Sequence, residues 1–130
     1  MENLDKFIGK TISTVVLTTE NKICFTFTDS TEMTLYDKGQ QCCESRYMTT
    51  DDDLTSFSSD ILLGIEIKSC GSKEFYDEIM HDIQFLEVIT NKGCITFAAH
   101  NDHNGYYSGF DIGLQFEDQV SLSEAGNNGP

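Results

Sequence analysis

The stretch Ile23-Cys24-Phe25-Thr26-Phe27-Thr28 sets the fold class of this chain. Large apolar side chains alternate in it with Cys and Thr, which is typical of a strand with one buried face. Polar turns at 20–22 and 29–31 flank the stretch, and apolar, β-branched or alternating segments lie beyond them at 12–19 and 33–36. We therefore predict a three-stranded antiparallel meander.

Further strands are predicted at 61–69, 83–90, 94–99 and 106–116, and the middle two form a hairpin about Asn91-Lys92-Gly93. Short helices are predicted after a Thr50 cap and, from apolar pairs spaced i,i+4, at 73–80. The expected fold is α+β but mainly β, an antiparallel sheet of about seven strands with one or two short helices. One face of the 61–69 strand is expected to carry Ile61, Leu63, Ile65 and Ile67.

The 130 residues suffice for one globular domain, expected at 1–116 and followed by a polar, frayed tail at 117–130. No apolar run approaches about 20 residues. The N-terminus has neither a basic nor an apolar region, so no secretory signal is predicted and the cytoplasm is the expected location. The edges and the uncovered face of such a sheet favour a homodimer.

The chain is strongly acidic, with 22 Asp and Glu against 8 Lys and Arg, a net charge of −14, and Arg46 as its only arginine. Because nucleic-acid binding needs basic side chains to neutralise phosphates, no direct nucleic-acid partner is expected. The negative charge is consistent with a basic protein partner or a bound cation, or it serves only to keep the protein soluble. The five cysteines are expected to be reduced thiols, and a redox role of the adjacent Cys42 and Cys43 stays open.

Two polar segments, 42–54 and 100–110, carry more donors, acceptors and aromatic rings than connecting loops need. We predict that they meet to form one ligand pocket, in which Arg46 holds an anionic group and Tyr106 or Tyr107 stacks on a ring. The predicted ligand-binding residues are Glu44, Arg46, Tyr47, His100, Asn101, His103, Asn104, Tyr106, Tyr107 and Phe110.

Other interpretations of these residues stay open. Arg46 can instead form a structural ion pair, and the run 51–53 can be a solvated helix start. Imidazole and carboxylate ligands suit a divalent metal, but their spacing matches no strong zinc pattern, so no cofactor is expected. The weak metal candidates are His81, His100, Asp102 and His103. A cysteine nucleophile lacks nearby positive charge, so no catalytic residue is assigned and an enzyme is the less favoured interpretation.

Residues 39–54 (GQQCCESRYMTTDDDL) and 100–110 (HNDHNGYYSGF) resemble motifs of a functionally uncharacterised family of small bacteriophage and prophage proteins. Residues 8–12 and 81–86 are also similar to that family, and the resemblance spans residues 7–113. It implies a viral origin and expression in the cytoplasm of a bacterial host, and it assigns no catalytic residues. By analogy with other small acidic phage proteins, we expect a role against host defence.

The leading hypothesis is a non-enzymatic phage accessory protein that binds a small ligand, such as a nucleotide-derived immune signal. The first alternative is an acidic inhibitor that mimics nucleic acid and covers a basic host protein, such as a CRISPR effector. This alternative requires carboxylates in a row on one exposed face and binding that weakens with added salt. The second alternative is a divalent-metal-dependent enzyme.

Overall fold

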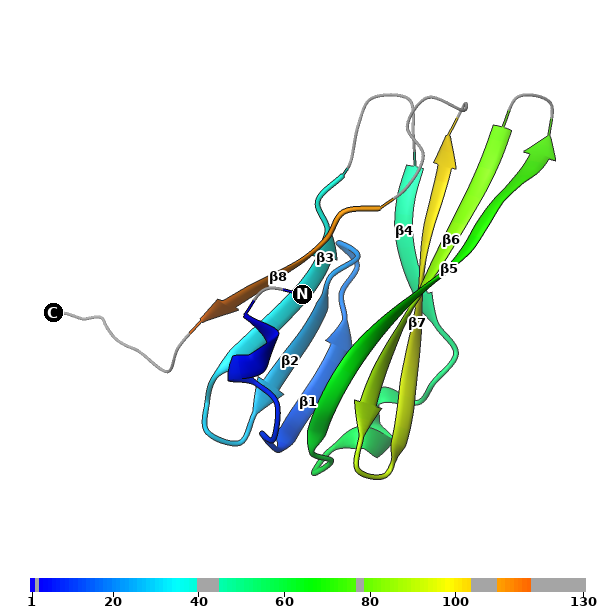
Figure 1. Cartoon of the computed structure of the whole chain (residues 1–130). Helices are drawn as coiled ribbons and strands as arrows, with labels where there is room; N and C mark the ends of the chain where they lie inside the picture. The colour runs from blue at the N-terminus through cyan, green and yellow to red at the C-terminus, as the bar shows by residue number, and fades with distance from the viewer. Residues whose placement is uncertain (2, 40–44, 77–78, 104–109, 118–130) are drawn as a thin grey trace, which may run out of the picture.

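The computed structural model describes residues 1, 3–39, 45–76, 79–103 and 110–117. Their eight strands form two antiparallel four-stranded sheets in the orders β1-β2-β3-β8 and β4-β7-β6-β5 (Figure 1). The first sheet contains β1 (Ile12–Leu17), β2 (Ile23–Phe27), β3 (Glu32–Asp37) and β8 (Ile112–Glu117). The second contains β4 (Ser45–Thr50), β5 (Leu62–Tyr76), β6 (Ile79–Thr90) and β7 (Gly93–His103). The prediction of a mainly β, antiparallel fold is confirmed, although the strands number eight and lie in two sheets.

The predicted meander forms the first sheet as far as β3. Phe25 pairs with Val15 on one side and with Met33 on the other, and all three side chains are buried. The two turns place Asn21 at a φ of 63° and Ser30 at a φ of 73°, in the left-handed region that Asn tolerates better than most residues. β8 then adds to the free edge of β3.

The second sheet is built around the predicted hairpin of β6 and β7. Thr90 pairs with Gly93, so Asn91 and Lys92 form the tip, and Gly93 has a φ of 151° that favours glycine. Apolar side chains from both sheets fill the space between them. The fully buried members of this core with the largest side chains are Phe7, Ile12, Ile23, Phe25, Phe27, Met33, Leu35, Leu62, Leu86, Val88, Ile95 and Phe97.

The predicted helices are wrong. The range 73–80 is occupied by β5 as far as Tyr76 and by β6 from Ile79, with 77–78 outside the described residues. Spacings of i,i+4 also fit a strand, since they are even, and pairing between strands overrides the local helical preference. Thr50 ends β4 instead of capping a helix, and the helix that follows is the 3-10 turn η2 (Leu54–Phe57), capped by Asp53.

Three features of the strand predictions also need correction. β4 lies where no clean periodicity was found, and β8 begins at Ile112, although residues 106–109 of the predicted last strand lie outside the described residues. In β5, Leu63 is exposed on the face opposite the buried Leu62, whereas Ile65 packs against the core, so the four predicted residues do not share one face. A register shift between Leu62 and Gly64 explains the difference, because a bulge moves the following side chains to the other face.

The two sheets are joined at one corner, where Thr11 pairs with Ile61 and the Ile12 N–H donates to the Asp60 carbonyl. The 3-10 turn η1 (Leu4–Lys6) leads into Phe7, whose ring stacks on Phe27 at 5.4 Å between centroids. Neither 3-10 turn in the described ranges has the length or the hydropathy to cross a membrane.

Candidate functional site

The described parts of the two polar segments lie side by side as β4 and β7. The register runs from Ser45 opposite Asp102 to Thr50 opposite Phe97. Because side chains alternate across a strand, this register sends the predicted site residues to two faces of the sheet. Arg46, Asn101 and His103 lie on the face toward the core, whereas Tyr47, His100 and Asp102 lie on the outer face. One pocket on a single face of the sheet therefore cannot contain them all.

The outer-face residues form a continuous cluster, which we call the histidine cluster (Tyr47, Thr49, His81, His100 and Asp102). The rings of Tyr47 and His100 stack with centroids 4.6 Å apart and planes 6° from parallel. His100 Nε2 lies 2.9 Å from Thr49 Oγ1, and its Nδ1 lies 3.2 Å from His81 Nε2. The chain of contacts continues from His81 Nδ1 to the Asp102 carboxylate.

The environment of the histidine cluster changes two pKa values. Burial, and then the charge of His81, lower the pKa of His100 below its usual 6.5, although Asp102 acts in the opposite direction. The neutral imidazole is therefore favoured at pH 7. Burial raises the pKa of Tyr47, and the Asp102 charge and a hydrogen bond to that carboxylate raise it further.

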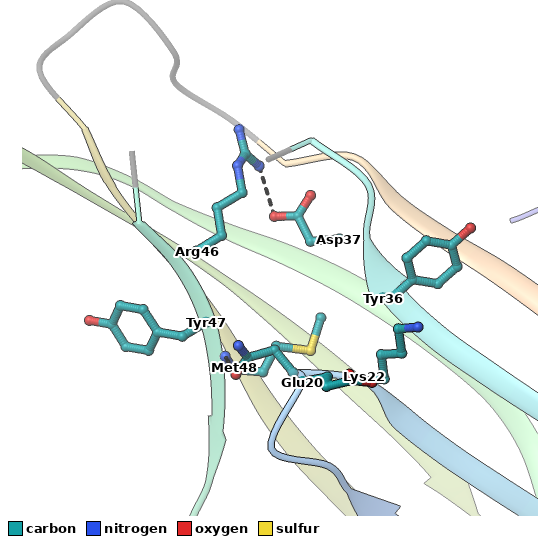
Figure 2. A pocket seen from close by; sticks show the side chains of 8 residues that line it. Glu20, Lys22, Tyr36, Asp37, Arg46, Tyr47 and Met48 are labelled. Carbon is teal, nitrogen blue, oxygen red and sulfur yellow. Dashed lines mark hydrogen bonds and ion pairs between the residues drawn. The ribbon is translucent and has the colours of Figure 1, made fainter. Parts of the chain in front are cut away.

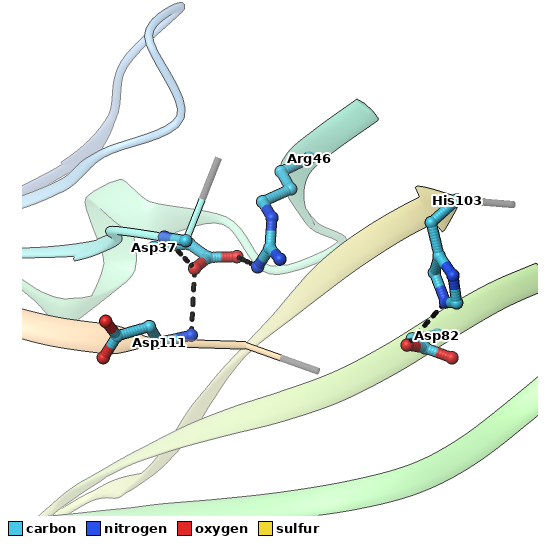
Figure 3. Close-up of polar contacts among 6 residues, drawn as sticks. Asp37, Arg46, Asp82, His103 and Asp111 are labelled. Atoms are coloured by element: carbon cyan, nitrogen blue, oxygen red, sulfur yellow. Dashed lines mark hydrogen bonds and ion pairs between the residues drawn. The ribbon is translucent and has the colours of Figure 1, made fainter. Parts of the chain in front are cut away.

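On the core-facing side, Arg46 and Asp37 form an ion pair that links the two sheets. Arg46 Nη1 lies 2.7 Å from Asp37 Oδ2, and the side chains are 8% and 9% exposed. Asp37 Oδ1 also accepts the N–H groups of Gly39 and Asp111, both at 3.0 Å (Figure 3). The geometry thus agrees with the structural interpretation of Arg46. A Cβ on Gly39 would lie 2.7 Å from Arg46 Nη1, so glycine makes room for the guanidinium.

A second buried pair lies on the same face of the second sheet. His103 Nε2 is 2.9 Å from Asp82 Oδ2, with side-chain exposures of 2% and 5% (Figure 3). Asn101 is buried between these pairs in the register, directly opposite both Arg46 and Asp82. Polar groups therefore replace the apolar core at this end of the sheet.

A pocket of about 240 Å³, the edge pocket, opens where the turn before β2 and the end of β3 approach β4. Asn21 Oδ1 holds this turn against β4 by accepting the Met48 N–H at 3.1 Å. Figure 2 shows the Arg46–Asp37 pair at one end, Lys22 beside Tyr36, and Tyr47 pointing away from Tyr36. The lining residues are Glu20, Asn21, Lys22, Tyr36, Asp37, Arg46, Tyr47 and Met48.

A second hollow of about 260 Å³, the outer hollow, lies beside the histidine cluster and shares Thr49 with it. Asp52 Oδ2 accepts the Thr96 N–H at 2.7 Å, and Asp53 Oδ1 accepts both the N–H and the hydroxyl of Thr55. Asp52 and Asp53, two of the three consecutive aspartates, thus accept hydrogen bonds from nearby threonines. The lining residues are Thr49, Thr50, Asp51, Asp52, Phe85, Thr96 and Ala98.

The weak metal candidates are divided in the same way. His81, His100 and Asp102 contact one another on the outer face, and His103 faces the core with Asp82. Within the described ranges, no group of three or more His, Cys, Asp or Glu side chains is arranged to hold a metal ion.

Several predicted site residues, Glu44, Asn104, Tyr106 and Tyr107, lie outside the described residues, as do Cys42 and Cys43. Phe110 is half-buried and packs against the core. The residues that the prediction missed are Lys22, Tyr36, Asp37, Thr49 and Asp82. The sequence indicates that Asp37 faces the core, because this residue continues the alternation of Met33 and Leu35. Thr49 and Asp82 stand in ordinary strand sequence and had no such signal.

The fold and the site define an antiparallel β-sandwich with a polar pocket at one edge and a histidine cluster on its outer face. The chain belongs to a family whose model matches residues 5–112 and which is described as a domain of unknown function, DUF7448. A search of curated proteins and a search of solved structures each found no match.

Proposed function

We propose that the protein is a non-enzymatic accessory protein that binds a small anionic ligand with an aromatic ring in the edge pocket. The observation that supports this best is the lining of the pocket, where Arg46 and Lys22 lie with the Tyr36 ring. Arg46 and Tyr47 come from the first polar segment, whereas Lys22 and Tyr36 come from the meander. The pocket thus depends on the packing of the two sheets.

The charges make the edge pocket a favourable place for an anion in a chain of net charge −14. Among the described lining residues, two basic side chains balance two acidic ones, so an approaching anion meets less repulsion there than from the acidic chain as a whole. The Lys22 ammonium lies 5.9 Å from the centroid of the Tyr36 ring, so a positive charge and an aromatic face adjoin. A phosphate beside a flat base presents the matching pair of groups.

The size of the pocket restricts the ligand. Pockets for drug-sized molecules measure about 300–1,000 Å³, so 240 Å³ holds one ring or one sugar phosphate. A nucleotide-derived signalling molecule, partly inserted, has the required chemistry. In a phage protein, capture of such a signal would protect the virus from a host defence that depends on it, which is the biological role we propose.

Isothermal titration calorimetry with cyclic nucleotides and ADP-ribose tests the proposal. We expect at least one of these ligands to bind and Lys22→Gln to weaken its binding about fivefold, because one lost charge contact costs about 1 kcal/mol. Lys92→Gln, at the tip of the β6–β7 hairpin, is the matched control and should leave binding unchanged. The proposal fails if no ligand of the panel binds or if Lys22→Gln binds as tightly as the wild type.

A further inference from the structure

Thr49 belongs to both the histidine cluster and the outer hollow, and this position suggests a covalent chemistry separate from the edge pocket. Its side chain is exposed at the edge strand of the second sheet. Its hydroxyl oxygen lies 2.9 Å from His100 Nε2, and its other neighbours in the hollow include the Phe85 ring and the small Ala98. A hydroxyl, a base and an open space for a reactant therefore meet at one residue.

The hydrogen bonds determine which imidazole nitrogens carry protons when both rings are neutral. The Asp102 carboxylate accepts only, so His81 Nδ1 carries the proton and His81 Nε2 becomes an acceptor. His100 Nδ1 must then donate to His81 Nε2, which leaves His100 Nε2 to accept from the Thr49 hydroxyl. Every donor points toward Asp102, as in the hydroxyl–imidazole–carboxylate arrangements that activate nucleophiles.

We propose that Thr49 is a nucleophile that accepts an acyl group from a neutral activated ester, with His100 as its general base. Thr49 Oγ1 attacks the carbonyl carbon while its proton moves to His100 Nε2. The new ester bond forms, the bond to the leaving group breaks, and the leaving group departs with the electron pair. His100 then releases its proton to water. His81 and Asp102 are positioning residues, which fix the tautomer of His100 and stabilise the positive charge that develops on it.

The outer hollow restricts the acyl donor. Among the described residues, its lining combines the Phe85 ring with the carboxylates of Asp51 and Asp52 and contains no basic side chain. Phosphorylated or otherwise anionic donors would be repelled, whereas an uncharged aryl or alkyl ester can lie on the ring. The lowered pKa of His100 keeps the base unprotonated at neutral pH, which supports the assignment.

Reaction with p-nitrophenyl acetate, followed by peptide mapping in a mass spectrometer, tests the proposal. We expect one acetyl group on Thr49 in the wild type and in Thr49→Ser, and none at position 49 in Thr49→Val, which keeps the shape but lacks the hydroxyl. Asp102→Asn should slow the labelling at least tenfold, because an amide can donate to His81 and reverse the tautomers.

The pH profile separates this role from a structural one. In the described part of the chain, the titratable groups that face His100 are His81 on β6, Asp102 on β7 and Tyr47 on β4. The wild-type rate at Thr49 should rise with pH and level off near neutrality, since His100 loses its proton below 6.5. The proposal is overturned if acetylation maps only to lysines, or if Asp102→Asn labels Thr49 at the wild-type rate. Neither result affects the edge pocket, which Thr49 does not line.

Discussion

Removing the charge of Asp37 should destabilise the protein strongly. Asp37→Asn keeps an oxygen to accept the N–H groups of Gly39 and Asp111, but it removes the negative charge that lies 2.7 Å from the buried Arg46 guanidinium. Breaking a buried ion pair costs about 3–5 kcal/mol, and the retained hydrogen bonds favour the lower figure of about 3. With a urea dependence of about 1.5 kcal/mol per molar, the unfolding midpoint should fall by about 2 M.

The assay is urea unfolding followed by circular dichroism, with Asp111→Asn as the control. Asp111 receives the same substitution beside the pair, but its side chain is exposed and only its backbone N–H contacts Asp37, so we expect a change within about 0.5 kcal/mol. Arg46→Met and the double variant complete a cycle, in which a coupling energy of about 2 kcal/mol or more is expected. A coupling below about 0.5 kcal/mol would refute the reasoning that the pair links the sheets.

Two further predictions concern pKa values. The Lys10 ammonium, with the Thr31 hydroxyl and N–H, lowers the pKa of Asp29 from 3.8 to about 2. The ionised Asp29 therefore stabilises the folded protein fully above pH 3.8, and this contribution is lost as the pH falls through about 2. In Lys10→Met, carboxyl NMR titration should show a higher pKa for Asp29, and an unchanged value would contradict the assigned cause. Asp102→Asn should lower the pKa of Tyr47, since two of the causes that raise it are lost, and ultraviolet titration read against a Tyr47→Phe variant should detect the shift.

The period-two signal was sufficient for β2, which lies between β1 and β3. Phe25 and Phe27 alternate with Cys24 and Thr26 and are buried, as this pattern predicts. β4 and β5 are edge strands, in which one side is unpaired and exposed polar residues interrupt the alternation. A bulge near Gly64 reverses the faces within β5, and no local pattern in the sequence reports a bulge.

The candidate site was predictable in composition but not in geometry. The sequence identified the two polar segments as candidate site residues. It did not show that Arg46 and Tyr47 are neighbours in a strand and so point to opposite faces, because residues 42–48 have no regular pattern. The alternation of Met33 and Leu35 indicates that Asp37 faces the core, but it does not indicate that Asp37 contacts Arg46. Lys22 likewise reaches the site through the packing of one sheet on the other, and such contacts between distant segments leave no periodic signal.

Because β4 and β7 each send alternate polar residues to the core-facing side of the second sheet, polar groups are buried at this end of the sandwich. A slip of one residue between β4 and β7 would place Tyr47 in the position of Arg46 and leave Asp37 buried without a cation. Because side chains have a period of two, that slip would move every residue of β4 to the opposite face and break the ion pair between the sheets. The Arg46–Asp37 pair thus favours the register of β4 and β7 in which Tyr47 and Thr49 both contact His100. An ion pair on the core-facing side therefore helps to position the histidine cluster on the outer face.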